Sequence, residues 1–338
     1  MRLVVLITTF VCYFAYAQTV SAATNTMNVD HIRQMPELPR GCEVTSLTML
    51  LRSAGVEYAN KMQLAKEVKK VPFRQNGYRG NPYNGFVGNM YTFNQSGYGV
   101  YHGPIADLAE QYLPNQIKDL TGGAITDVYA AIDRGTPVWV ITNTRFRKLP
   151  ESQFYYWKTK DGTVKVTYRE HSVLVTGYDD QYVYVNDPLY HQRNRKVNRA
   201  NFEQAWVQMG SQAITYVKRE PVNLDVNGDA ESFKEMAYKF DQTVYVPVRA
   251  LAEETGTSLS YIPEKKSIIL KQEDAKVVVH LDNGQVSVNN RYIDLKAPIE
   301  LIDGMTSVPV RLFEKHLGAT IQWNGTTNTV FVYTNKKG

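Results

Sequence analysis

The last third of the 338-residue chain repeats itself. The stretch VNGDAESFKEMAYKFDQTVYVPVRALAEETGTSLSYIPEKKSIIL, which starts at Val226, aligns without a gap on VNNRYIDLKAPIELIDGMTSVPVRLFEKHLGATIQWNGTTNTVFV, which starts at Val288. Every aligned pair of positions is 62 apart, and Arg249 falls on Arg311. Each unit predicts a strand, a VPVR turn into a short helix, a glycine stop and a hairpin. Residues 220–338 are therefore expected to form one β-rich module of two repeats.

The other end of the chain predicts export. Residues 1–23 read MRLVVLITTFVCYFAYAQTVSAA, in which one arginine precedes a short apolar run and small residues follow. This pattern is typical of a secretory signal cleaved after Ala22 or Ala23. The alternative is a retained membrane anchor, but the apolar run of about 15 residues is shorter than the roughly 20 that a spanning helix needs. We expect a secreted protein, extracellular or associated with the cell wall, with no transmembrane span after signal removal.

Composition narrows the class of protein. The chain is 43% apolar and 21% charged, which is typical of a globular protein. Its net charge is +5, and the basic residues are scattered without a run of five. This pattern argues against a nucleic-acid partner. A mild positive balance weakly favours anionic polymers of the cell envelope, so a cell-wall polymer is a candidate partner.

Residues 24–219 change their periodicity along the chain. An N-terminal strap, 24–37, precedes segments with helical spacing at 42–54, 61–71, 105–113 and 125–135. Later segments with strand character are TPVWVITN, VKVTYRE, HSVLVTGYD, YVYVNDP and QAITYVK, and FEQAWVQMG is a short helix between the last two. Helices followed by antiparallel strands predict an α+β domain. Between them, 74–103 is dense in Gly, Asn and Tyr, which predicts a long functional loop with exposed aromatic side chains.

One cysteine remains after signal removal. Cys12 lies inside the signal, so Cys42 has no disulfide partner, and an unpaired thiol in an exported protein is a candidate reactive group. Cys42 follows Gly41 and starts a helical pattern, and a helix N-terminus lowers a thiol pKa. The alternative is a small buried apolar residue, a common role for free cysteines.

A cysteine nucleophile needs a base and a group that orients it. Among six histidines, His171 opens a strand, and the turn near 179–181 places Asp187 beside it on the neighbouring strand. The backbone N–H of Cys42 and the side-chain amide of Gln34 are candidate donors to an oxyanion. The alternatives are a polar strand start for His171, a turn residue before Pro188 for Asp187, and a solvated strap residue for Gln34.

Three separated motifs resemble a known family. PELPRGCEVTSLTMLL, then GNPYNGFVGN with GYGVY, then HSVLVTGYDDQYVYVNDP resemble the bacterial cysteine peptidase-like family related to the double-glycine leader peptidases of bacteriocin exporters. The resemblance covers roughly 28–218. It implies a papain-like fold for residues 24–219, with Cys42 as nucleophile, His171 as base, Asp187 as orienting group and Gln34 as oxyanion donor.

The repeats resemble the copper amine oxidase N-terminal-like, or stalk, domain through their VNG and VPVR elements. A copper site needs clustered histidines. The repeats contain only His280 and His316, which are far apart in sequence, so we expect neither a metal nor another cofactor. The expected function is an exported thiol hydrolase, a cysteine peptidase or amidase acting on a peptide or protein through a thioester, tethered at the envelope by the repeats. Acyl transfer through the same thioester stays open. The alternative is a non-catalytic envelope-binding protein with a degenerate papain-like domain.

Overall fold

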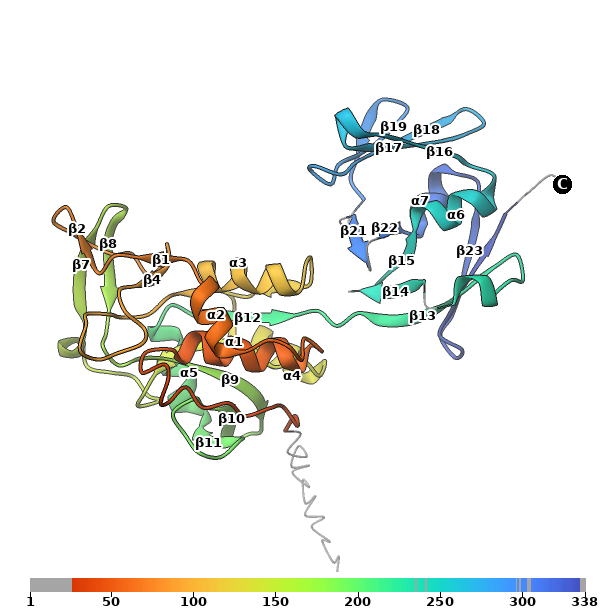
Figure 1. Cartoon of the computed structure of the whole chain (residues 1–338). Helices are drawn as coiled ribbons and strands as arrows, with labels where there is room; N and C mark the ends of the chain where they lie inside the picture. Colours follow the sequence, from red (N-terminus) through yellow and green to blue (C-terminus); the bar gives the residue numbers. More distant parts are fainter. Residues whose placement is uncertain are drawn as a thin grey trace, which may run out of the picture.

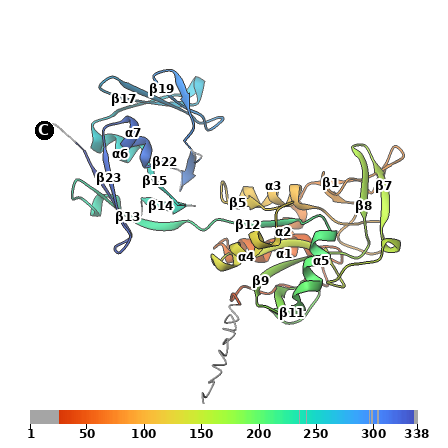
Figure 2. The same cartoon turned by 180° about the vertical axis from the view of Figure 1, so that it is seen from behind.

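The chain folds into two lobes. The computed structural model describes residues 26–234, 236–240, 242–295, 297, 299–302 and 305–334, so the predicted signal, 1–23, lies outside the described residues. The chain leaves the first lobe through β12 (Ala213–Tyr216) and enters the second as β13 (Glu220–Val226), as Figure 1 and the rear view in Figure 2 show. None of the helices in these ranges is long and apolar enough to cross a membrane.

A six-stranded sheet forms the centre of the first lobe. All of its neighbouring strands are antiparallel. Their order is β11 (Arg195–Asn198), β10 (Tyr182–Asn186), β9 (Glu170–Tyr178), β6 (Val138–Asn143), β12 and β5 (Ile117–Asp119). The α+β class predicted from the sequence is confirmed, although β5 and β11 were not anticipated.

Helices cover both faces of this sheet. Apolar residues of α1 (Cys42–Ser53), α2 (Lys61–Glu67) and α3 (His102–Tyr112) pack on one face, and those of α4 (Ile125–Asp133) and α5 (Arg199–Gln208) pack on the other. Successive strand side chains point to opposite faces. Leu174 of β9 accordingly joins the core under α1, while Val173 and Val175 join the core under α5. This layering places the first residue of α1 next to the start of β9.

Two predicted segments differ from the structure. The second helix was expected over 61–71, but it ends at Glu67, and β1 (Lys70–Val71) pairs in parallel with β4 (Phe86–Val87). The segment 74–103 is also less irregular than expected, since it contains β2 (Arg74–Gln75) and β3 (Tyr78–Arg79).

The aromatic side chains of 74–103 divide into two groups. Tyr98 and Tyr101 are buried against Trp157 of β7 (Tyr155–Thr159), a strand that pairs with β8 (Gly162–Val166). Tyr91 and Phe93 are exposed, as the sequence predicted. The buried group anchors the segment, and the exposed group remains available at its surface.

The second lobe contains both repeats around one core. Each repeat runs strand, helix and hairpin as predicted: β15 (Thr243–Pro247), α6 (Val248–Thr255), β16 (Ser258–Ile262) and β17 (Ser267–Gln272) in the first, and β22 (Met305–Pro309), α7 (Arg311–His316), β23 (Thr320–Asn324) and β24 (Thr329–Tyr333) in the second. The remaining strands are β14 (Ala237–Phe240), β18 (Ala275–His280), β19 (Val286–Val288), β20 (Arg291–Ile293) and β21 (Glu300–Ile302). Gly256 and Gly318 end the two helices with φ of 69° and 66°, a left-handed conformation that favours glycine.

Candidate active site

The first turn of α1 positions Cys42. Gly41 is the residue before the helix, and its carbonyl accepts a hydrogen bond from the Thr45 N–H at 3.0 Å. A Cβ atom at position 41 would lie 2.5 Å from the Cβ of Leu38, so glycine allows the preceding turn to pack tightly against the helix start. The N–H groups of the first helical turn have no intrahelical partner. Cys42 therefore lies at the positive end of α1, as the sequence predicted.

The thiol of Cys42 is turned toward a carboxyl group. Its side chain is buried, and Sγ donates to Oε2 of Glu43 at 3.3 Å. Burial, followed by the charges of Glu43 and Glu170, raises the pKa of the Cys42 thiol well above its ordinary value. The backbone of Ser172 hydrogen-bonds to the thiol and acts in the opposite direction. The lowered pKa expected from the helix N-terminus is therefore wrong for this arrangement, because burial and two carboxyl groups outweigh it.

Glu43 and Glu170 form a buried carboxyl pair beside Cys42. Burial raises the pKa of Glu43 to about 7, and burial together with Glu43 raises the pKa of Glu170 well above its ordinary value. The Val100 N–H donates to Oε1 of Glu43 at 2.7 Å, whereas Oε1 of Glu170 is buried without a partner. A Cβ on Gly99 would lie 2.5 Å from Glu43 Oε1 and 2.7 Å from Glu170 Oε2, so glycine lets the backbone approach both groups.

Sequence reasoning missed this pair. Two carboxyl groups this close cannot both ionise at low cost, so the pair retains at least one proton near neutral pH. The available signal was a charged residue, Glu43, inside an otherwise apolar helix start.

His171 and Asp187 form a second buried pair. Nε2 of His171 lies 2.8 Å from Oδ1 of Asp187, and each side chain is 2% exposed. Arg195 Nη1 lies 2.6 Å from the other carboxylate oxygen. Burial alone would raise the pKa of Asp187, but the hydrogen bond and charge of His171, with further hydrogen bonds from Leu189 and Arg195, lower it to about 2. The predicted proximity of His171 and Asp187 is present, and Asp187 is a stable anion that can orient the imidazole.

In the described part of the chain, Cys42 and His171 are linked only through the backbone of β9, without a direct bond between their side chains. Ser172, whose backbone hydrogen-bonds to the thiol, directly follows His171 in β9. The His171 ring packs against Phe146 on the α5 side of the sheet, and no hydrogen bond among the described residues joins it to Cys42 Sγ. Because Nε2 contacts Asp187, Nδ1 is the nitrogen left to act as a base. Catalysis would require a rearrangement that brings the Cys42 thiol and this atom together, because the His171 ring lies on the α5 face of the sheet and α1 on the other face.

Gln34 braces the turn that precedes Cys42. Its Nε2 donates to the carbonyls of Leu38 and Pro39 at 3.1 and 3.0 Å, and its Oε1 is buried without a partner. The side chain is 2% exposed, so the alternative of a solvated strap residue is wrong. Its amide hydrogens are directed to these two carbonyls in this arrangement. The role of Gln34 as an oxyanion donor stays a prediction.

The same cluster contains the residues that could hold a metal ion. Cys42, Glu43 and Glu170 each offer one ligand atom, and these three atoms lie within 4.8 Å of one another. Zn²⁺ accepts thiolate and carboxylate ligands, so this donor set fits it. A proton shared between Glu43 and Glu170 explains the contact of the two buried carboxyl groups equally well without a metal ion. The expected absence of a metal therefore stays a prediction.

The carboxyl pair predicts how stability depends on pH. The pKa of Glu43 is raised on folding, so its contribution is present below about pH 4.5 and is lost as pH rises through about 7. Each unit by which folding raises a pKa corresponds to about 1.4 kcal/mol. Urea unfolding between pH 4.5 and 7 should show stability falling with pH, and Glu43→Gln should flatten this fall.

The matched control for this measurement is Glu57→Gln, which changes an exposed carboxyl group outside the site. This variant should retain the slope of the wild type. An unchanged slope in Glu43→Gln would contradict the assignment of the buried proton to the pair.

Comparisons with known proteins match each part of the chain to a family. Residues 26–214 match the model of the Peptidase C39 like family, and 225–332 match that of the copper amine oxidase N-terminal domain. The chain is 50% identical over 184 residues to the uncharacterized protein YvpB of Bacillus subtilis strain 168. The aligned region covers 54% of this chain and 71% of YvpB.

A solved structure matches the same part of the chain. It is the crystal structure of a Bacillus anthracis protein classed as a C39-like peptidase, which is 55% identical with a TM-score of 0.58. The match covers 59% of this chain and 99% of the solved one. Both resemblances predicted from the sequence motifs are confirmed.

Proposed function

Because the chain belongs to the Peptidase C39 like family, we propose that it is an exported cysteine peptidase held at the cell envelope by its repeats. The observation that carries the proposal is the buried His171–Asp187 pair, 2.8 Å apart, on the strand whose next residue, Ser172, hydrogen-bonds to the Cys42 thiol through its backbone. Its substrates would be peptides or proteins. The same thioester chemistry would serve an amidase or an acyl transferase.

The proposed reaction divides into two steps. Nδ1 of His171 takes the Cys42 proton, and the thiolate attacks the peptide carbonyl carbon. The C–N bond then breaks, His171 returns the proton to the leaving amine, and the acyl group stays on sulfur as a thioester. Water, deprotonated by His171, attacks the thioester and releases the carboxylic acid and the thiol. Asp187 holds the imidazole through Nε2 and stabilises its charged form in both steps.

The test is peptide hydrolysis by the purified chain lacking residues 1–23. A peptide library followed by mass spectrometry would identify cleaved bonds, and Cys42→Ser is the matched inactive control. Cleavage that survives this substitution would come from another source and would contradict the proposal.

The segment 74–103 supplies one wall of the proposed substrate groove. Arg40, two residues before Cys42, donates to the carbonyls of Asn89 and Thr92, and its guanidinium lies 4.9 Å from the Phe93 ring centre. Phe93 is 64% exposed. Tyr168, two residues before Glu170, is exposed as well. These side chains present apolar surface close to Cys42, which suits the apolar side chains of a peptide.

Removing this surface should weaken peptide binding. Phe93→Ala is expected to raise KM about tenfold, corresponding to about 1.4 kcal/mol of lost contact, with little change in kcat. The matched control is Tyr58→Ala, which removes an exposed aromatic side chain beyond the other end of α1. Equal KM values for both variants, measured with an apolar peptide, would place the groove elsewhere.

The second lobe is proposed to retain the enzyme at the envelope. The lobes touch where Arg219 donates to the Pro114 carbonyl at 3.0 Å and lies 3.9 Å from Glu300. The apolar clusters under α1 and α5 contain only residues before 218, and the main cluster of the repeats only residues after 221. A small third cluster around Phe240 is the exception, since Val217 packs against it. Truncation after Lys218 should therefore leave hydrolysis intact and greatly reduce retention on isolated cell walls. A truncated protein that unfolds would show that the lobes form one cooperative unit.

One observation favours the non-catalytic alternative. The Cys42 thiol is buried, bonded to Glu43 and not bonded to His171, which is an inactive arrangement for a nucleophile. In an envelope-binding protein the thiol would keep this inactive arrangement permanently. In an enzyme the thiol would change to an active arrangement when substrate binds. Peptide hydrolysis that depends on Cys42 decides between them.

A further inference from the structure

The second lobe contains two pockets that the duplication relates to each other. The larger has a volume of about 740 Å³ and the smaller about 460 Å³. Ten residues of the smaller pocket have a counterpart 62 positions away in the larger one: Pro247 with Pro309, Val248 with Val310, Arg249 with Arg311, Ala250 with Leu312, Glu253 with Lys315, Leu259 with Ile321, Tyr261 with Trp323, Ile268 with Val330, Met305 with Thr243, and Thr306 with Val244.

A pseudo-twofold axis explains this relation. β15 and β22 pair antiparallel with Val246 opposite Val308, and these two residues are themselves equivalent in the repeat. The axis passes between them. Each pocket therefore takes a helix and a hairpin from one repeat and a strand from the other. The two pockets are therefore equivalent in construction, and their lining residues can be compared position by position.

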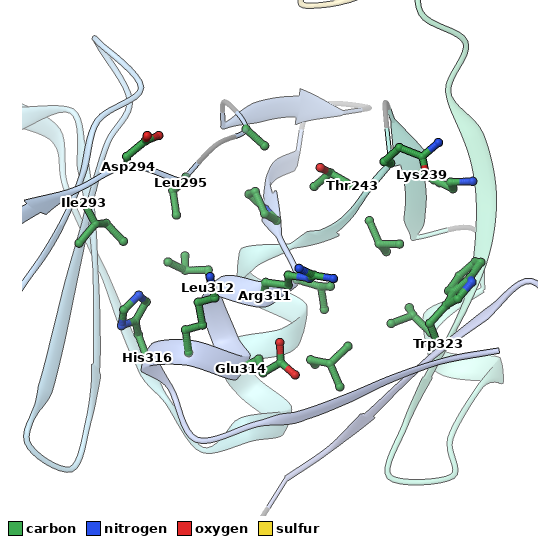
Figure 3. Close-up of a pocket in the computed structure, with 18 residues that line it drawn as sticks. Lys239, Thr243, Ile293, Asp294, Leu295, Arg311, Leu312, Glu314, His316 and Trp323 are labelled. Atoms are coloured by element: carbon green, nitrogen blue, oxygen red, sulfur yellow. The ribbon is translucent and has the colours of Figure 1, made fainter. Parts of the chain in front are cut away.

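Both pockets combine an arginine with an aromatic ring. Arg311 and Trp323 line the larger pocket, and Arg249 and Tyr261 line the smaller. The side chain of neither arginine makes a hydrogen bond or ion pair with the part of the chain that the structure describes. Trp323 is 47% exposed and Tyr261 50%. Figure 3 shows Arg311 and Trp323 around the larger pocket, with His316 and Ile293 at the end away from Trp323.

The two pockets differ in charge. Lys315 of the larger pocket replaces Glu253 of the smaller, and Lys239 also lines the larger one. Arg311 and Lys315 face Asp294 and Glu314 in the larger pocket, and Lys239, which lies 3.9 Å from Glu220 at its edge, adds a further positive charge, whereas Arg249 and Glu253 balance each other in the smaller. The larger pocket therefore suits an anionic group, and the smaller suits a neutral one.

We propose that the two pockets bind one anionic polysaccharide chain. The C–H face of a sugar ring would pack on Trp323 or Tyr261, and a sugar carboxylate would meet the planar fork of Arg311. A chain that occupies both pockets gains affinity from the effective concentration of its second site. The inference rests on the proposed envelope attachment and names its ligand. A nucleic acid suits the pair less well, because the smaller pocket has no net charge.

Trp323 provides a direct signal for the test. Trp139, Trp157 and Trp206 are buried, so solvent-accessible tryptophan emission belongs to Trp323. Hyaluronan and polygalacturonate, both rich in uronic acids, should change this emission saturably in the full mature chain. Neutral chitin oligosaccharides should bind at least tenfold more weakly. Absence of a saturable response to both acidic probes, or an equal response to oligothymidylate, would overturn the proposal.

Two substitutions test the two pockets separately by calorimetry. Arg311→Ala should weaken binding of a short acidic oligosaccharide at least tenfold, while Arg291→Ala, an exposed arginine in neither pocket, should not. In the wild type, long chains should bind at least tenfold more tightly than tetrasaccharides, and Tyr261→Ala should remove most of this gain. Wild-type affinity in Arg311→Ala would overturn the assignment.

Measuring retention on isolated cell walls distinguishes failure of the proposed pocket ligand from failure of the proposed envelope attachment. If Arg311→Ala loses acidic oligosaccharides but the chain truncated after Lys218 is still retained on walls, the pocket assignment stands and the attachment fails. If truncation abolishes retention while Arg311→Ala and Tyr261→Ala bind walls as the wild type does, attachment stands and the pocket assignment fails.

Discussion

Replacing Cys42 by alanine is expected to abolish peptide hydrolysis, and His171→Ala should reduce kcat by several orders of magnitude. In comparable triads, loss of the nucleophile or the base costs on the order of 10⁶ in kcat, whereas loss of the orienting acid costs roughly 10⁴. Asp187→Asn should therefore retain more activity than His171→Ala. Steady-state kinetics with a peptide cleaved by the wild type measures all three variants.

The chain offers a matched control for the base. His102 Nδ1 lies 2.5 Å from Asp119 Oδ2, so a second His–Asp pair exists on α3 and β5. His102→Ala removes a similar interaction outside the site and should leave kcat unchanged. If His102→Ala abolishes hydrolysis while His171→Ala does not, the base has been wrongly assigned.

The second large effect concerns the reactivity of Cys42 without substrate. Burial and the two carboxyl groups raise its pKa, and each unit lowers the thiolate fraction at neutral pH about tenfold. Iodoacetamide should therefore alkylate Cys42 at pH 7 at least tenfold more slowly than a free thiol in a peptide. The rate should rise with pH, with its inflection above the ordinary thiol value.

Glu43→Gln should make Cys42 more reactive. The substitution removes the nearest charge, 3.3 Å from Sγ, so the thiol pKa should fall and the inflection should shift to lower pH. The rate at pH 7 should increase about tenfold, while Glu57→Gln should match the wild type. An inflection that does not move would show that burial alone controls the thiol.

The fold of this chain was largely predictable from local patterns. The spacing of apolar residues predicted a helix for α1 and strands for β6, β9 and β10, and the structure has these elements. The internal repeat predicted both helices and hairpins of the second lobe, because similar sequences that recur at a fixed spacing adopt the same supersecondary unit. Short strands were missed where two or three residues pair, as in β1 and β5, since such lengths carry no periodicity.

The site was predictable in its residues but not in its electrostatics. The turn near 179–181 fixes which residues of the two flanking strands lie opposite each other. Counting outward from this turn therefore predicted the proximity of His171 and Asp187. The burial of Glu43 against Glu170 could not be predicted in this way, because α1 and β9 are far apart in sequence, with 126 positions between Ser46 and its hydrogen-bond partner Ser172, and no local pattern relates them. Long-range burial therefore reversed the pKa direction that helix polarity alone predicted for the thiol.

The pairing of β15 with β22 has a consequence for the ancestry of the second lobe. A single repeat contains only part of either pocket, because each pocket borrows a strand from the other repeat. An unduplicated ancestor could have formed both pockets only as a symmetric homodimer, joined through the same strand in each subunit. Fusion of the two copies would free the halves to diverge, and Lys315 in the place of Glu253 makes one pocket basic while the other stays neutral.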